Sequence, residues 1–181
     1  MAFTAAREAL DIEDILAGHS QRDTQAADQL LVLLDGIEDP HNVGAIVRTA
    51  LAAGAAGLII PERRAAGLTD TVARVSAGAL AHLPVARVKN LARSMEQLKE
   101  AGFWLIGLDE RAEKSYTEVD YKGRIAIVMG SEGTGLHELV RKRCDFLVSI
   151  PTTGPVRSLN VSVAASVVLF EALRRRTGGR K

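Results

Sequence analysis

The residues with the most distinctive chemistry lie in three short segments, and the first of these holds Asn42 and Arg48. Asn42 stands where the chain would turn from a strand into a helix, so the sequence predicts that it is the N-cap of that helix. Taken alone, an asparagine at this position is most simply a cap. Arg48 lies six residues further on and interrupts the otherwise apolar run AIVRTALAAGA. Because a charge in such a run needs a specific partner, Arg48 is a candidate functional residue.

The second segment, IAIVMGSEGTGL at residues 125–136, places a glycine-rich loop between a buried strand and a helix. Glycines in such a loop let the backbone approach a ligand closely. Gly130, Gly133 and Gly135 have the spacing G-x-x-G-x-G, which matches neither the dinucleotide-binding fingerprint nor the P-loop. Glu132 inside the loop would repel a phosphate. The segment therefore predicts a site for a cationic or hydroxyl-bearing ligand.

The third segment covers residues 146–173, where a strand ends at Ile150 and a polar turn leads into a long apolar helix. Ser158, Leu159 and Asn160 open that helix, and Ser158 or Asn160 taken singly is most simply a helix cap. The helix itself, VSVAASVVLFEALRRR, is apolar on nearly every turn, so most of its circumference should be covered by protein. This pattern indicates a central core position or a subunit interface.

The elements that would position these segments alternate between short apolar runs and amphipathic stretches. The apolar runs resemble strands of a parallel sheet covered on both faces, and they span residues 30–35, 57–60, 83–88, 104–109, 125–130 and 146–151. Helices are predicted at residues 43–53, 70–77, 91–100, 136–143 and 161–176. The alternation predicts an α/β domain with a mostly parallel sheet, helices on both faces and right-handed crossovers.

Residues 1–29 have a different character from the rest of the chain. They are polar and acidic, with two short helices at most around AREALDIEDILAG. We expect them to form a linker or lead-in segment, and residues 30–181 to form the single domain.

The composition argues against several classes of protein. No apolar run approaches the roughly 18 residues that span a bilayer, and the start MAFTAAREAL lacks the apolar core of a secretion signal. We therefore expect a cytoplasmic protein that has no membrane partner. Cys144 is the single cysteine, which rules out an internal disulfide, and the four histidines are scattered singly, so no metal site is expected.

The net charge of +1 argues neither for nor against nucleic acid, but the charge is unevenly distributed. The first forty residues are mainly acidic. Residues 174–181 are basic and contain no aspartate or glutamate; their charged residues are Arg174, Arg175, Arg176, Arg180 and Lys181. A basic end of this kind either binds a phosphate backbone or is a solvated helix end that complements the helix dipole, and the sequence leaves both open.

Together, the three segments resemble the motifs of the SpoU/TrmH family of RNA ribose methyltransferases, within the knotted SPOUT superfamily. The motifs occur in order as N-x-G-x-x-x-R at Asn42, Gly44 and Arg48, MGSEGTGL at residues 129–136, and IPTTGPVRSLNVSVAASVVLFEA at residues 150–172. The intervening sequence is most similar to the branch that methylates a guanosine ribose in large-subunit (23S) ribosomal RNA. Members of that branch usually carry an additional amino-terminal RNA-binding domain, and this chain starts within what resembles the linker after it.

The resemblance implies a deep trefoil knot at the carboxyl-terminal end of the domain and S-adenosylmethionine as the cofactor. By their positions in the motifs, Gly130, Ile150 and Leu159 would bind the cofactor largely through backbone groups. Leu108, at the end of the strand WLIGLD, would line the adenine pocket. Apolar and backbone contacts suit an adenine ring.

The family's proposed catalytic group corresponds to Arg48, which would act on the ribose 2′-hydroxyl with help from a substrate phosphate. Because a guanidinium stays protonated and is a poor base, we expect Arg48 to hold the phosphate and to stabilise charge on the 2′-oxygen. Glu132, Ser158 and Asn160 would orient the ribose, Arg48 or the cofactor. Asn42 would position Arg48 or the RNA backbone.

The resemblance also implies a homodimer whose sites lie near the interface, with RNA as the other partner. Three alternatives remain open at this point. The substrate could be transfer RNA rather than ribosomal RNA, or the protein could be a knotted RNA-binding protein without catalysis. An oxidoreductase of the doubly wound class is the third, and the glycine spacing argues against it.

Overall fold

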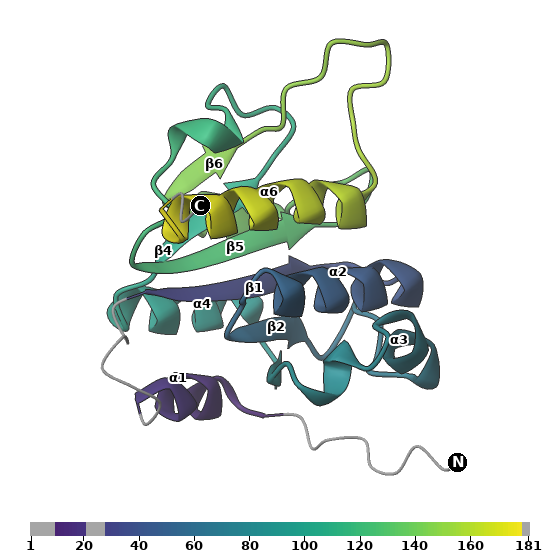
Figure 1. Ribbon diagram of the computed structural model, residues 1–181, viewed down its shortest axis with the longest axis vertical. Coiled ribbons are helices and arrows are strands. Elements are labelled where there is room, and N and C mark those ends of the chain that lie inside the picture. The colour runs from purple at the N-terminus through teal and green to yellow at the C-terminus, as the bar shows by residue number, and fades with distance from the viewer. Residues whose placement is uncertain (1–9, 21–27, 179–181) are drawn as a thin grey trace.

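The computed structural model describes residues 10–20 and 28–178, which form an α/β domain around a six-stranded sheet (Figure 1). The strands are β1 (Gln29–Asp35), β2 (Gly57–Pro61), β3 (Val85–Val88), β4 (Trp104–Leu108), β5 (Arg124–Gly130) and β6 (Phe146–Val148). They pair in parallel throughout, in the order β3-β2-β1-β5-β4-β6. The predicted strands and the mostly parallel sheet are confirmed. The threading of the last segment into a knot stays a prediction.

Helices cover both faces of the sheet (Figure 1). One face carries α2 (Pro40–Ala52), α3 (Asp70–Val75) and α6 (Val161–Arg176), and the other carries α1 (Ile12–Ser20), α4 (Leu91–Glu100) and α5 (Glu138–Arg143). Two short 3-10 helices are η1 (Ala79–Ala81) and η2 (Tyr116–Glu118). Successive side chains of a strand point to opposite faces, so both faces of the central strands bury apolar residues. No helix in the described part of the chain is long and apolar enough to cross a membrane.

The start of α2 differs from the prediction. The helix begins at Pro40, because Asp39 is its N-cap: a carboxylate oxygen of Asp39 accepts a hydrogen bond from the backbone N–H of His41 at 2.9 Å. Proline suits the first helical position, where its missing N–H leaves no hydrogen bond unmade. The prediction that Asn42 is the N-cap is therefore wrong, and Asn42 is the third residue inside the helix.

The segment before β1 packs on the sheet. Leu10 makes two backbone hydrogen bonds with β3, each of 3.1 Å. Ile12 and Ile15 of α1 are buried in the core on the face that α4 also covers. Residues 1–9 and 21–27 of the expected lead-in segment lie outside the described residues, and the domain boundary at residue 30 stays a prediction.

The arginines that end α6 bind groups of the protein itself. Arg174 and Arg175 each pair with Glu171 at 2.8 Å. Arg176 donates hydrogen bonds to the backbone carbonyls of Tyr121 and Gly123, at 2.9 and 3.2 Å. These contacts favour a structural helix end over phosphate binding for these three residues. Arg180 and Lys181 lie outside the described residues.

Candidate active site

A cavity of about 250 Å³ lies at the carboxyl ends of β4, β5 and β6. Open parallel sheets bind their ligands at this end of the strands. The residues predicted to bind the cofactor all line the cavity: Leu108 ends β4, Gly130 ends β5, Ile150 follows β6 and Leu159 precedes α6. Residues from distant parts of the chain thus converge on one site.

The glycine-rich loop after β5 forms one wall of the cavity and folds back on itself. The backbone N–H of Gly135 donates to the carbonyl of Ser131 at 2.9 Å, and the hydroxyls of Ser131 and Thr134 lie 2.5 Å apart. A Cβ atom on Gly130 would lie 2.1 Å from the carbonyl carbon of Gly135, which no side chain tolerates. The loop itself therefore requires Gly130, in addition to any close approach of a ligand.

Asn42, Glu132 and Asn160 form a hydrogen-bonded cluster beside the cavity. Oε1 of Glu132 accepts hydrogen bonds from the side-chain amide of Asn42 at 3.3 Å, from that of Asn160, and from the backbone N–H of Val161 at 3.2 Å. The Asn160 amide also donates to Oδ1 of Asn42 at 3.1 Å. Within residues 10–20 and 28–178, Oε2 of Glu132 has no hydrogen-bond partner, and Glu132 lines the cavity. Its carboxylate is therefore accessible to a cationic or hydroxyl-bearing ligand, and the binding of such a ligand stays a prediction.

Asn160 has two structural roles at once. Its Oδ1 accepts hydrogen bonds from the backbone N–H groups of Ser162 and Val163, at 2.9 and 3.4 Å, so it is the N-cap of α6. Its amide belongs to the cluster with Glu132. Ser158 lies two residues earlier, is exposed and lines the cavity without capping the helix. The interpretation as a helix cap is therefore confirmed for Asn160 and wrong for Ser158.

Arg48 lies on α2 but outside this cluster. Its side chain is exposed, does not line the cavity, and makes no ion pair or hydrogen bond with any residue that the structure describes. The residues of α2 that face the core include Val43, Ile46 and Val47, and Arg48 points away from them. The described residues therefore supply no partner for this charge, and the expectation that Arg48 binds a substrate phosphate stays a prediction. Gly44, in the same motif, is needed for packing, because a Cβ there would lie 2.7 Å from Cβ of Val75 on α3.

Asp109 is a buried residue of the cavity wall that the sequence analysis did not single out. It follows β4 and accepts hydrogen bonds from the guanidinium of Arg111, at 3.1 and 3.2 Å, and from that of Arg141 on α5 at 2.5 Å. Burial alone would raise the pKa of this carboxyl, but the hydrogen bonds from Arg111 and Arg141 outweigh it and lower the pKa to about 2. Asp109 therefore stays ionised and connects the loop after β4 to α5.

A second buried carboxylate, Asp35 at the end of β1, fixes the far end of the glycine-rich loop. Its Oδ2 accepts a hydrogen bond from the backbone N–H of His137 at 2.7 Å, and its Oδ1 lies 2.9 Å from Nδ1 of the same histidine. The loop that carries Glu132 is thus held at both ends. Within the described ranges, no group of three or more histidine, cysteine, aspartate or glutamate side chains is placed to hold a metal ion.

Comparison with known sequences identifies the family of this chain. The model of the SpoU rRNA Methylase family matches residues 29–170. YacO of Bacillus subtilis, whose name places it in the TrmH family of tRNA/rRNA methyltransferases, is 46% identical over 176 residues. That match covers 97% of this chain and 70% of YacO.

Solved structures show the same fold. The SpoU methyltransferase AviRb from Streptomyces viridochromogenes, in complex with its cofactor AdoMet, matches with a TM-score of 0.79 and 35% identity over 84% of this chain. This chain spans 62% of the length of that AviRb chain. A structure described for 2-OH methylation of C/U34 on tRNA matches with a TM-score of 0.75 and 30% identity, over 83% of this chain and 98% of that one. Sequence and fold together show that the chain belongs to the SpoU rRNA methylase family.

Proposed function

We propose that this chain transfers a methyl group from S-adenosylmethionine to a ribose 2′-hydroxyl of RNA. The observation that carries the proposal is the cavity itself, in which Leu108, Gly130, Ile150 and Leu159 converge beside Glu132. The family and the curated relative described above are named for RNA methylation, and AviRb binds AdoMet. The activity and the cofactor are assigned to this chain on those grounds.

The lining of the cavity suits this cofactor. Leu108, Ile150 and Leu159 offer apolar side chains and backbone groups, which fit a planar adenine ring. Glu132 adds a carboxylate, one oxygen of which has no partner among the residues that the structure describes, and this negative charge complements the positive charge of a sulfonium. When bound, the cofactor would supply a methyl group on a strong leaving group. The protein must then position the ribose oxygen.

The cluster of Asn42, Glu132 and Asn160 is suited to that positioning. Its members come from α2, the glycine-rich loop and the start of α6, and their hydrogen bonds hold one another in place at the edge of the cavity. Side chains held by such contacts lose little freedom when a substrate binds, which favours a defined geometry of attack. Ser158 is exposed at the same cavity, and its hydroxyl can donate a hydrogen bond to a ribose or phosphate oxygen.

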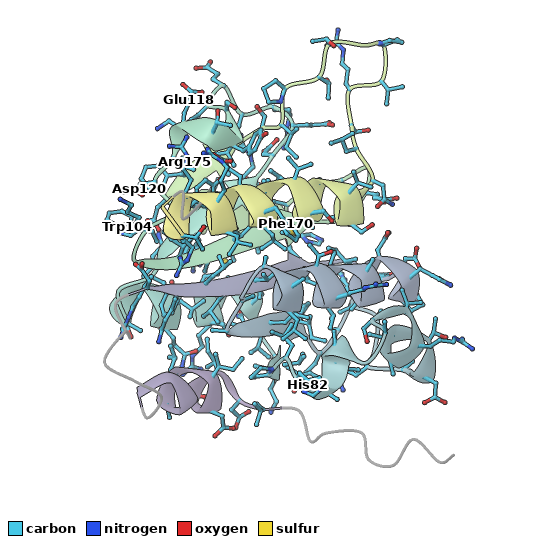
Figure 2. All side chains as sticks on the ribbon, in the orientation of Figure 1. His82, Trp104, Glu118, Asp120, Phe170 and Arg175 are labelled. Atoms are coloured by element: carbon cyan, nitrogen blue, oxygen red, sulfur yellow. The ribbon has the colours of Figure 1, made fainter. Side chains whose placement is uncertain are left out.

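We infer that Arg48 acts at the cavity of a second copy of the chain. On α6, Val163 and Phe170 are 49% and 48% exposed and lie seven residues apart, so they share one face. Figure 2 labels Phe170 on this helix. The hydroxyl of Thr49 on α2 lies 3.3 Å from that of Ser166 on α6, so the two helices touch beside that face. Arg48 is exposed on α2. We infer a homodimer through these faces, in which Arg48 of one subunit stabilises charge at the cavity of the other.

The proposal also concerns which RNA is the substrate. A guanosine of large-subunit (23S) ribosomal RNA is our first candidate. The family's description names rRNA, which supports ribosomal RNA as the class of substrate. Transfer RNA is the second candidate, because the neighbour that this chain covers almost completely is described for tRNA. YacO is named for both kinds of RNA.

The test uses S-adenosylmethionine with a radiolabelled methyl group, and unmodified 23S ribosomal RNA or transfer RNA as acceptor. After digestion, mass spectrometry of the nucleosides locates the label. We expect 2′-O-methylguanosine from ribosomal RNA, whereas ribose label in transfer RNA would select the second candidate. Label on a base would contradict the ribose assignment. Tight RNA binding without transfer would favour a binding protein that lacks catalysis.

A further inference from the structure

A second cavity, of about 590 Å³, opens beside the first. The two are continuous, because they share Glu110, Arg111, Ser149, Ile150, Thr152 and Arg157. We call the second cavity the outer cleft. It lies between the loop that follows β4 and residues 149–160, which Figure 1 shows as a long loop that extends from the body of the domain. Because residues 151–160 are exposed, the cleft is open to a large ligand.

Positive charge dominates the walls of the outer cleft. Arg157 is exposed and makes no ion pair or hydrogen bond with any of the described residues. Arg111 binds Asp109, but the same carboxylate also binds Arg141, so one negative charge is shared by two guanidinium groups. Glu110 is the one acidic residue that lines the cleft within the described part of the chain. Two arginines and one carboxylate thus line the outer cleft in the part of the chain that the structure describes.

Arg111 is also held in a defined orientation. Its Nε and Nη2 atoms bind the two oxygens of Asp109, and its backbone N–H donates to Asp109 as well, at 2.9 Å. The side chain remains 64% exposed, so its other donor atom can reach solvent or a ligand. A guanidinium that is already oriented loses little freedom when it binds an anion. The hydroxyls of Thr152 and Thr153 lie on the same walls and can donate further hydrogen bonds.

We propose that the outer cleft binds an anionic oxygen group through Arg111 and Arg157, and that this group is a phosphate of the substrate RNA. The proposal rests on the proposed function and deepens it. It places the RNA backbone beside the methyl-donor cavity, between the loop after β4 and residues 149–157, with no need for base-specific contacts. The same chemistry would suit the carboxylate of the cofactor's methionyl group, if that group extended from the first cavity. The size and exposure of the cleft favour the RNA.

The experiment compares the unmodified chain with Arg157→Gln and Arg157→Lys. Arg93→Gln is the matched control, because Arg93 is exposed on α4 and its side chain has no partner among the described residues. Calorimetry measures the dissociation constants of S-adenosylmethionine and of 5′-methylthioadenosine, which lacks the carboxylate. Fluorescence anisotropy measures binding of 23S ribosomal RNA and transfer RNA transcripts at several salt concentrations.

For a phosphate contact, Arg157→Gln weakens RNA binding several-fold, reduces the salt slope by about one, and leaves S-adenosylmethionine binding unchanged. Arg157→Lys restores part of the RNA affinity. If Arg157→Gln instead weakens S-adenosylmethionine and not 5′-methylthioadenosine, the anion is the cofactor's carboxylate and the RNA assignment is overturned. Equal behaviour of the Arg157 and Arg93 variants for every ligand rejects the site. Because these readouts do not depend on turnover, absent methyl transfer would count only against the proposed function.

Discussion

The side-chain amide of Asn160 donates a hydrogen bond to Oε1 of Glu132, while Oδ1 of the same asparagine caps α6. One residue thus joins the start of the last helix to the glycine-rich loop. Asn42 of α2 joins the same cluster. The three sequence motifs are therefore parts of one hydrogen-bonded unit. A substitution in one motif should alter the hydrogen bonds of the other two.

Glu132→Gln should remove the negative charge of this cluster and keep its hydrogen bonds. Every donor of the cluster meets Oε1 alone, so the carbonyl oxygen of glutamine can accept the same hydrogen bonds. We expect stability within about 1 kcal/mol of the parent, and a several-fold loss of affinity for the positively charged S-adenosylmethionine. The affinity for the neutral S-adenosylhomocysteine should change less. Calorimetric titration of both ligands measures the difference.

Glu132→Ala is the companion variant, because it removes the acceptor as well as the charge. It should lower the free energy of unfolding by about 1 kcal/mol more than Glu132→Gln does, and it should weaken both ligands. Equal losses for the two ligands in Glu132→Gln would show that the carboxylate does not act through the charge of the sulfonium.

The sequence predicted the elements of this fold better than their contacts. Five of the six strands of the sheet contain a continuous apolar run, β3 with Arg87 being the exception, and Asn160 is followed by an apolar helix. These features can be seen in the local sequence. The pairs Asp35 with His137 and Asp109 with Arg141 depend on which strands are neighbours in the sheet, which periodicity does not report. The cofactor residues were placed by the family resemblance.

Gly130→Ala should disrupt the cavity from within. The new Cβ would lie 2.1 Å from the carbonyl carbon of Gly135, so the glycine-rich loop must move. We expect a loss of about 2 kcal/mol or more in the free energy of unfolding, together with loss of S-adenosylmethionine binding. Chemical denaturation and calorimetry measure the two effects. Gly67→Ala is the control, because its Cβ would meet only Cγ2 of Thr69 at 3.7 Å; a similar loss there would refute the steric explanation.

Asp109 should make stability depend on pH below 4. Its pKa is lowered from the ordinary 3.8 to about 2, so its stabilising effect is complete above pH 3.8 and is lost as the pH falls through 2. Asp109→Asn should therefore lower the free energy of unfolding by roughly 1 to 2 kcal/mol at pH 7. The variant should also lose less stability than the parent between pH 4 and pH 2. Urea denaturation at each pH measures both.

Glu171 titrates in the same range and provides the comparison. Its pKa is lowered from 4.5 to about 2, chiefly by the hydrogen bond from Arg174. Glu171→Gln should remove part of the acid dependence without changing the cavity, so S-adenosylmethionine binding at pH 7 should be unaffected. A parallel pH profile for Asp109→Asn and the parent would contradict the role given to Asp109.

Phe170→Glu should dissociate the proposed dimer. Phe170 is 48% exposed on the face of α6 that also carries Val163, and a carboxylate there would be buried without a partner in the interface. Analytical ultracentrifugation should show a dimer for the parent and a monomer for the variant. Leu139→Glu is the control, because Leu139 is 53% exposed on α5, which covers the other face of the sheet. A monomeric parent would reject the dimer outright.

Arg48 and Glu132 should complement each other between subunits. If each site combines Arg48 of one subunit with Glu132 of the other, Arg48→Ala and Glu132→Ala dimers are each inactive, but a mixed dimer contains one intact site. After denaturation and refolding of an equal mixture, half of the dimers are mixed, so methyl transfer should recover to about a quarter of the parent rate. If both residues served the cavity of their own subunit, the mixed dimer would contain no intact site, and the mixture would stay inactive. The outcome therefore decides whether the exposed position of Arg48 on α2 reflects a site completed by the partner.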